Sequence, residues 1–205
     1  MFFLALSLAL LAGSGAEAAT AASPQTQADE YTRYELLGPE TSQFRVVYDV
    51  TATSGGATRY FNPIRKGSEA SRESVTDRMT GDALKFDVVS AEEARSTGFG
   101  EAEAGTQYIR VTLSRAVPAG GQVRLRIDKT YRDPASYFRE GDEIVFLRSL
   151  GIKRNTIVLP PGYELIRCNM PSQVLTEPGG RIAVSFVNSN PEAATLSIRA
   201  RKLPQ

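Results

Sequence analysis

Hydrophobic and polar residues alternate along several segments of this chain. In residues 44–51, "FRVVYDVT", apolar side chains fall at nearly every second position, with charged or polar ones between them. The same pattern recurs in "LKFDVV" (84–89), "YIRVTLS" (108–114), "VRLRIDKTY" (123–131), "IAVSFVN" (182–188) and "TLSIRAR" (195–201). A period of two predicts β-strands with one buried and one solvated face. "EIVFLRSL" (143–150) and "TIVLP" (156–160) are continuously apolar, which is typical of strands covered on both sides.

Turn residues separate these segments. "SGGA" (54–57), "PAGGQ" (118–122), "PPGY" (160–163) and "EPGGR" (177–181) supply glycine and proline where a chain reverses. "SAEEARST" (90–97) predicts one or two helical turns, with Ser90 as the cap and Glu93 at the capping-box position. The sequence therefore predicts an antiparallel β-sandwich of about nine or ten strands, immunoglobulin-like in the broad sense, with little helix. We expect one domain over residues 31–204, with a possible subdomain joint near 132–142.

The N-terminus has the pattern of an export signal. Residues 2–13, "FFLALSLALLAG", form an apolar run too short to span a bilayer comfortably, and small residues follow it. We expect a signal peptide over residues 1–21, cleaved near 18–21, and a disordered polar leader over residues 22–30. No lysine or arginine precedes the apolar run, so a retained anchor or a misassigned start stays open. With the signal removed, the sequence predicts no stable membrane span and a periplasmic or secreted location.

Composition narrows the chemistry. The chain has 205 residues, no histidine and a net charge of +1. Without histidine, the usual general base at neutral pH and the usual zinc ligand are missing. The near-zero net charge argues against nucleic acid as a partner. We therefore predict no catalytic residues, no metal ligands and no cofactor. Cys168 is the single cysteine, which predicts either a small core residue or a thiol that pairs with another chain.

One hairpin-like segment carries a family resemblance. "YIRVTLSRAVPAGGQVRLRIDKTY" (108–131) reads as strand, Pro-x-Gly turn and strand ending in tyrosine. Together with the earlier strands from Phe44 onward, it resembles the amino-terminal β-sandwich of the gluzincin aminopeptidases. The resemblance covers Phe44 to Tyr131 and implies an accessory sandwich. The zinc-binding H-E-x-x-H motif of that family is absent, so no catalytic role is implied.

Residues 60–78 interrupt the run of strands and form the first candidate site. We interpret "YFNPIRKGSEASRESVTDR" as a long loop. Its two cations, glycine and hydroxyl suit a carboxylate, sulfate or phosphate. The candidate binding residues here are Tyr60, Phe61, Asn62, Arg65, Lys66 and Ser68. The alternative is a solvated connection whose charges serve solubility.

A second candidate lies at residues 131–143, "YRDPASYFREGDE". In one interpretation, exposed aromatics at Tyr137 and Phe138 would dock on a partner or a sugar. The clustered acids are also of a type that can hold Ca²⁺, although no residue is assigned as a metal ligand. The alternative is a turn whose aromatic residues pack into the core.

The sequence thus predicts an exported, non-catalytic binding or accessory module. Its partner would be an envelope protein or an exposed polymer, bound through the 60–78 segment. Two alternatives stay open: a carboxylate-dependent hydrolase acting on glycans, and a structural subunit with no site of its own. The first would show two facing carboxylates in a cleft, and the second a large flat apolar face.

Overall fold

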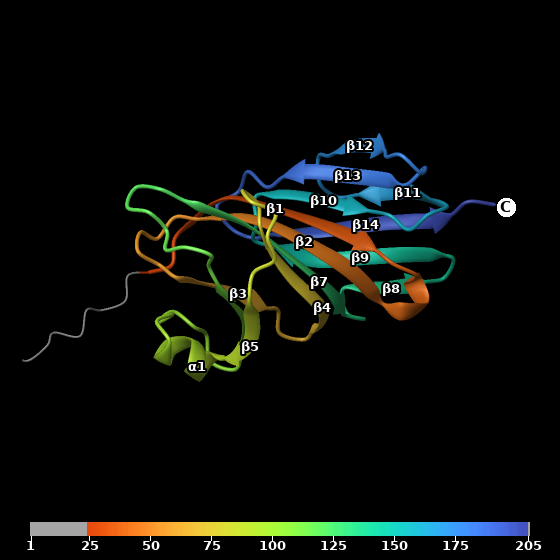
Figure 1. Ribbon diagram of the computed structural model, residues 1–205. Coiled ribbons are helices and arrows are strands. Elements are labelled where there is room, and N and C mark those ends of the chain that lie inside the picture. The colour runs from red at the N-terminus through yellow and green to blue at the C-terminus, as the bar shows by residue number, and fades with distance from the viewer. Residues whose placement is uncertain (1–23, 205) are drawn as a thin grey trace, which may run out of the picture.

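The computed structural model describes residues 24–204, and within them fourteen strands form three sheets (Figure 1). The predicted all-β sandwich is confirmed, but the count of nine or ten strands was too low. Several strands are short or polar, and two of them cover most of the segment predicted to be a loop. The predicted signal peptide, residues 1–21, lies outside the described residues. No helix of the described chain is long and apolar enough to cross a membrane.

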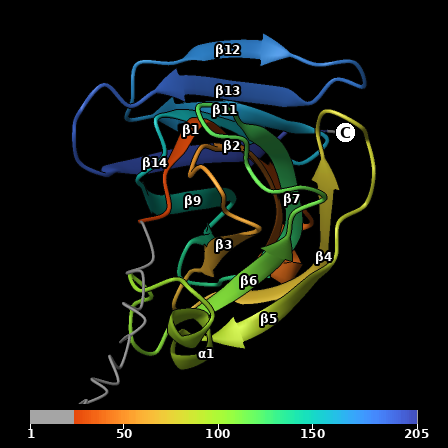
Figure 2. The same cartoon turned by 60° about the vertical axis from the view of Figure 1, so that its left-hand side comes forward.

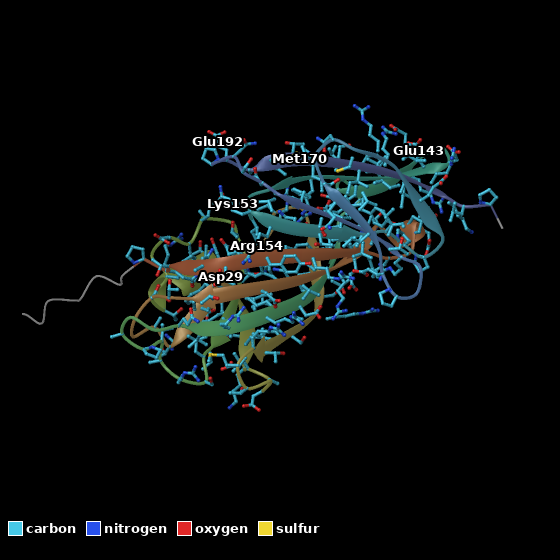
Figure 3. All side chains as sticks on the ribbon, turned by 90° about the horizontal axis from the view of Figure 1, so that it is seen from above. Asp29, Glu143, Lys153, Arg154, Met170 and Glu192 are labelled. Atoms are coloured by element: carbon cyan, nitrogen blue, oxygen red, sulfur yellow. The ribbon has the colours of Figure 1, made fainter. Side chains whose placement is uncertain are left out.

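The largest sheet has seven strands drawn from both halves of the chain. In spatial order they are β12 (Gln173–Thr176), β13 (Ile182–Val187), β10 (Arg154–Val158), β1 (Gln27–Leu36), β2 (Gln43–Ala52), β7 (Val123–Arg132) and β4 (Glu69–Asp77). β1 and β10 pair in parallel, unlike the uniformly antiparallel prediction, while the other neighbours are antiparallel. An ion pair of 3.7 Å between Arg154 and Asp29 spans the parallel pair (Figure 3).

Two smaller sheets complete the sandwich. The four-stranded sheet has the order β11 (Tyr163–Cys168), β14 (Ala194–Lys202), β9 (Glu143–Leu150) and β8 (Tyr137–Glu140). The three-stranded sheet has the order β3 (Arg59–Ile64), β6 (Gln107–Thr112) and β5 (Phe86–Ser90). Cys168, on β11, is half-buried and packs against the core.

Both smaller sheets pack on the same face of the large sheet. On β2, Phe44 meets Phe146 of the four-stranded sheet edge to face, with ring centroids 5.3 Å apart. Tyr48, which has the same parity on β2, places its hydroxyl 3.3 Å from that of Tyr60 in the three-stranded sheet. The main core therefore holds side chains from all three sheets. Figure 2 shows the three-stranded sheet away from the β12–β13 edge of the molecule.

The opposite face of the large sheet carries several exposed or half-buried ion pairs. Arg45 pairs with Asp128, and Arg126 binds Asp49 through two bonds of 2.7 Å. Alternation along the strands therefore produces the predicted division into an apolar and a solvated face. Exposed pairs of this kind contribute little stability individually.

Two local predictions have different outcomes. The short helix is confirmed as α1 (Ala91–Ser96), where the Ser90 side chain accepts a hydrogen bond of 3.2 Å from the Glu93 amide. The disordered leader is wrong for the described part of residues 22–30, because β1 starts at Gln27. Before it, the Gln25 side chain binds both backbone groups of Phe61, at 2.8 and 3.0 Å. These bonds occupy backbone groups at the edge of β3, which explains why a polar segment is ordered.

Candidate functional site: a cationic cleft between the smaller sheets

A lysine occupies an inward position of strand β7. The alternating series of Val123, Leu125 and Ile127 continues to Lys129, which is 3% exposed. Its ammonium donates a 2.6 Å hydrogen bond to Asn62 Oδ1 and lies 5.0 Å from the centre of the Tyr131 ring. A buried ammonium is unfavourable unless it is compensated.

An arginine likewise occupies an inward-facing position of strand β9. Ile144 and Phe146 point inward, and Arg148 follows at the same parity, 5% exposed. Its Nη1 atom donates to Asp133 Oδ2 at 2.8 Å and to Ser136 Oγ at 3.1 Å. The guanidinium therefore has a carboxylate partner on one side only.

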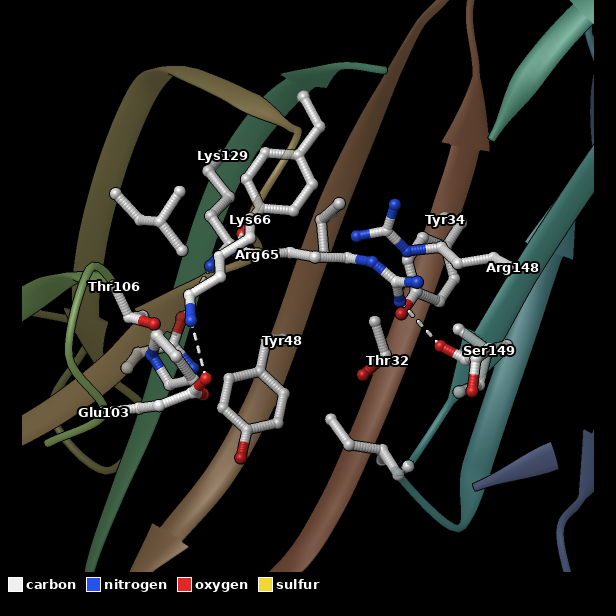
Figure 4. A pocket seen from close by; sticks show the side chains of 18 residues that line it. Thr32, Tyr34, Tyr48, Arg65, Lys66, Glu103, Thr106, Lys129, Arg148 and Ser149 are labelled. Atoms are coloured by element: carbon white, nitrogen blue, oxygen red, sulfur yellow. Dashed lines mark hydrogen bonds and ion pairs between the residues drawn. The ribbon is translucent and has the colours of Figure 1, made fainter. Parts of the chain in front are cut away.

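These two side chains line a cleft of about 480 Å³. The turn after β3 contributes Arg65 and Lys66, and Glu103 lies beside Lys66 (Figure 4). Among the residues that the structure describes, four basic side chains line the cleft, against a single lining carboxylate. The cleft also has apolar walls, formed by Tyr34, Val46, Ile64, Tyr131, Leu150 and Ile152.

The cations of the cleft differ in how they are paired. Lys66 donates to Glu103 at 2.6 Å, and both side chains are exposed. Among the ion pairs found in residues 24–204, none involves Arg65 or Lys129. The Arg65 guanidinium instead donates to the Ser149 backbone carbonyl at 2.7 Å. Positive charge in the cleft therefore exceeds negative charge.

The pKa values reflect this surplus. Burial, followed by the nearby charge of Arg148, lowers the pKa of Lys129 to about 7, while Glu73 acts in the opposite direction. The pKa of Arg65 is also lowered, first by burial and then by Arg148. Burial alone would raise the pKa of Asp133, but hydrogen bonds from two serines and the charge of Arg148 hold it below its usual value. An anion in the cleft would favour the charged forms of Lys129 and Arg65 and would therefore raise the pKa of both.

Two threonine hydroxyls that line the cleft have no hydrogen-bond partner within residues 24–204. Thr32 Oγ1, on β1, belongs to a side chain that is 1% exposed. Thr106 Oγ1, just before β6, belongs to one that is 6% exposed. Buried hydroxyls usually form hydrogen bonds, so each threonine is an unused hydrogen-bond donor beside the basic side chains of the cleft.

The first predicted site is only partly assembled here. Residues 60–78 are not a long loop: β3 and β4 occupy most of them, and the turn of residues 65–68 crosses between two sheets. Asn62, Arg65 and Lys66 do line the cleft. Ser68 lies behind it, donating to Asp133 at 2.9 Å.

The two aromatic residues of this segment are buried. Tyr60 is 1% exposed and donates to Gln27 at 2.7 Å. Phe61 is 4% exposed and stacks on Phe99, with ring centroids 5.0 Å apart. Neither ring is available to a partner at the surface, contrary to its place among the candidate binding residues. Alternation in β3 buries Tyr60 in the main core, while α1 and its flanking loop cover Phe61 in a second core.

The second predicted site also differs. Tyr137 is fully buried and donates to the Leu37 carbonyl at 2.9 Å, so it offers no exposed ring. Phe138 is half-buried. Asp133 is used internally, by Ser136 and Arg148. In residues 24–204, no group of three or more acidic or cysteine side chains is arranged to hold a metal ion.

Comparison with known proteins bears on the fold. No family model matches the sequence, and no curated protein matches it. An M1 zinc metallopeptidase from Deinococcus radiodurans is similar in structure, with a TM-score of 0.52 and 12% identity over 84% of this chain. A two-domain M1 zinc metallopeptidase mutant bound to L-tryptophan gives a TM-score of 0.51 at 13% identity. The fold resembles the N-terminal domain of these M1 zinc metallopeptidases.

The predicted resemblance to gluzincin aminopeptidases is thereby confirmed at the level of the fold, and it extends well beyond Phe44 to Tyr131. The chain spans 41% of the length of these peptidases. At this identity the likeness to M1 peptidases concerns the fold alone.

The sequence held a signal for the two cations that the prediction missed. Lys129 and Arg148 each follow inward-facing apolar residues at every second position of their strand. Strand alternation therefore predicts that both charged side chains point into the sandwich. Their meeting in one cleft depends on how the sheets pack, which local sequence patterns do not define.

Proposed function

We propose that this chain is a non-catalytic binding module of the cell envelope that recognises an anionic group on a partner. The partner would be an envelope protein or an exposed polymer. One observation carries the proposal: four cations line a single cleft against one lining carboxylate. Such a concave, partly apolar site with convergent polar groups suits ligand binding.

The envelope location rests on the apolar N-terminal segment followed by small residues. The resemblance to a non-catalytic peptidase domain supports an accessory role. A carboxylate-dependent hydrolase receives less support from this cleft. General acid–base catalysis on a glycan needs two facing carboxylates, and the single lining carboxylate, Glu103, is paired with Lys66.

The test is crosslinking capture from intact cells with an Arg65→Glu, Lys66→Glu double variant. Both side chains are exposed, so the variant should keep the melting temperature of the wild type. We expect a partner captured by the wild type to be lost in the variant, because two attractive charges become repulsive. Capture by the wild type should also weaken at high salt.

The matched control reverses two exposed cations that do not line the cleft, in a Lys85→Glu, Arg124→Glu variant. This control should capture the same partner as the wild type. Equal capture by the cleft variant would refute the proposed site. Absence of any partner would favour a structural subunit without a site of its own.

A further inference from the structure

Two arginines of the cleft, Arg65 and Arg148, act on each other electrostatically, and Asp133 forms an ion pair with Arg148 but not with Arg65. Figure 4 shows the side chains of Arg65 and Arg148 pointing toward one another, and both line the cleft together with Thr32. On the outer face of the large sheet, by contrast, Arg45 and Arg126 each bind an aspartate through two guanidinium nitrogens. Adjacent like charges repel, so this arrangement gains most from an anion in contact with both groups.

The cleft offers several unused donors from different directions. Lys129 has three N–H groups, and Asn62 accepts one hydrogen bond from them. The hydrogen bonds found for the Arg65 and Arg148 guanidiniums each use Nη1. The Thr32 hydroxyl has no partner in the described structure. These donors come from four segments: β1, β7, β9 and the turn after β3.

We propose, building on the proposed function, that the anionic group which the cleft recognises on its partner is a phosphate monoester, for which a small organic phosphate ester is the probe. A tetrahedral phosphate presents three terminal oxygens and close to two negative charges. Donors that converge from several sides suit that shape better than a planar carboxylate, which a single arginine fork satisfies. Arg65 and Lys129, for which no ion pair is found in residues 24–204, would supply two positive charges to a dianion, because a bound phosphate favours the ammonium form of Lys129.

The rest of the cleft accommodates an uncharged body attached to the phosphate. Its volume of about 480 Å³ falls in the usual range for small-molecule sites and leaves room beyond one phosphate group. Tyr34, Ile64 and Leu150 supply apolar wall beside the cations.

An adjoining hollow limits how much negative charge the ligand carries. This hollow, of about 510 Å³, shares Tyr48 and Asn62 with the cleft and is lined by Glu30, Glu101 and Glu103. No lysine or arginine stands among the described residues that line it. A second phosphate on the ligand would be repelled there, so the site selects monophosphates over polyphosphates.

The experiment is calorimetric titration of the full chain with phenyl phosphate, using Thr32→Val as the test variant. The substitution keeps the shape of the side chain and removes a hydroxyl that has no partner, so folding should not suffer. We expect binding about 10-fold weaker, as for the loss of one hydrogen bond to a charged group. Thr51→Val is the matched control, since Thr51 is equally buried and unpartnered but does not line the cleft. It should bind like the wild type.

Three further ligands identify the chemistry. Inorganic phosphate should bind more weakly than phenyl phosphate, and equal affinity would make free phosphate the ligand and overturn the ester. Benzoate should bind more weakly still, and equal affinity would overturn the choice of phosphate. Inositol hexakisphosphate should bind more weakly than phenyl phosphate, and tighter binding would overturn the selection against polyanions.

The two proposals fail in distinguishable ways. If phenyl phosphate does not bind, or binds equally to the Thr32→Val variant, the phosphate site is refuted. If partner capture is still lost in the Arg65→Glu, Lys66→Glu variant, the proposed recognition function survives that result. If capture is also unchanged, both proposals fall.

Discussion

The buried lysine on β7 sets the electrostatics of the cleft. Lys129 faces Asn62 from β3, Arg148 from β9 and the Tyr131 ring from its own strand, and Glu73 is the acid that acts on it from β4. Burial and Arg148 lower its pKa to about 7, from an ordinary value of 10.5. The folded protein therefore releases a proton that the unfolded chain still holds at mildly alkaline pH.

This shift predicts a pH dependence of stability. Between pH 7 and 9 the unfolded chain binds more protons than the folded one at Lys129, so the free energy of unfolding should rise with pH. From these two pKa values the rise is about 2 kcal/mol. A Lys129→Met variant lacks the titrating group and should lose this increment. Urea denaturation of both proteins at pH 7, 8 and 9 measures it.

The relevant quantity is the difference in free energy of unfolding between the wild type and the Lys129→Met variant. Contributions from titratable groups common to both proteins cancel in this difference. Staying at or below pH 9 also keeps tyrosines in the unfolded chain protonated. A constant difference across this range would show that Lys129 is not a neutralised, buried amine.

At the residue scale, the sequence indicated the chemistry of the candidate side chains better than their exposure. The charges of Arg65 and Lys66 predict a binding role, and both residues line the cleft. The aromatic ring of Phe61, close to a proline, also predicts a binding role, but Phe61 is buried. A residue type shows what a side chain can bind, while its exposure depends on strand parity and on which segment covers it.

At the element scale, the predicted loop is two strands in different sheets. Edge strand β4 has the polar sequence "EASRESVTD", in which Val75 and Asp77 are buried. A register shift between Ser71 and Ser74 interrupts its alternation, and Arg72 there has a positive φ of 55°. Polar composition and a bulge are common ways to protect a sheet edge, and they remove the period-two signal.

The three-stranded sheet depends on a second core beneath α1. Phe61 stacks on Phe99 there, beside Ala94 and Tyr108. Replacing Phe61 by alanine should lower the free energy of unfolding by about 3–5 kcal/mol, as is usual for a buried phenylalanine. Chemical denaturation measures the loss.

The control for this change is Phe138→Ala. Phe138 is half-buried and belongs to neither core cluster. Its replacement should therefore lower the free energy of unfolding clearly less than Phe61→Ala does. Equal and small costs at both positions would contradict a structural role for Phe61 and return it to the candidate binding residues.

At the scale of the whole molecule, the cleft exists because the two halves of the chain share one sheet. β1 from the first half pairs in parallel with β10 from the second, and β9 then brings Arg148 over the face that carries Lys129. The alternation of residues predicted most strands and the sandwich. It contained no information on this long-range pairing, because pairing depends on partners far apart in the sequence.

The most direct test of the anion site is NMR mapping of phenyl phosphate on the full, isotope-labelled chain. We expect shift changes concentrated at Thr32, Lys129 and Arg148, three residues from strands β1, β7 and β9, because all three line the cleft. Thr51 and strands β12 and β13 should remain unperturbed. Changes confined to another surface, or no changes at saturating ligand, would contradict the central claim that this cleft binds an anion.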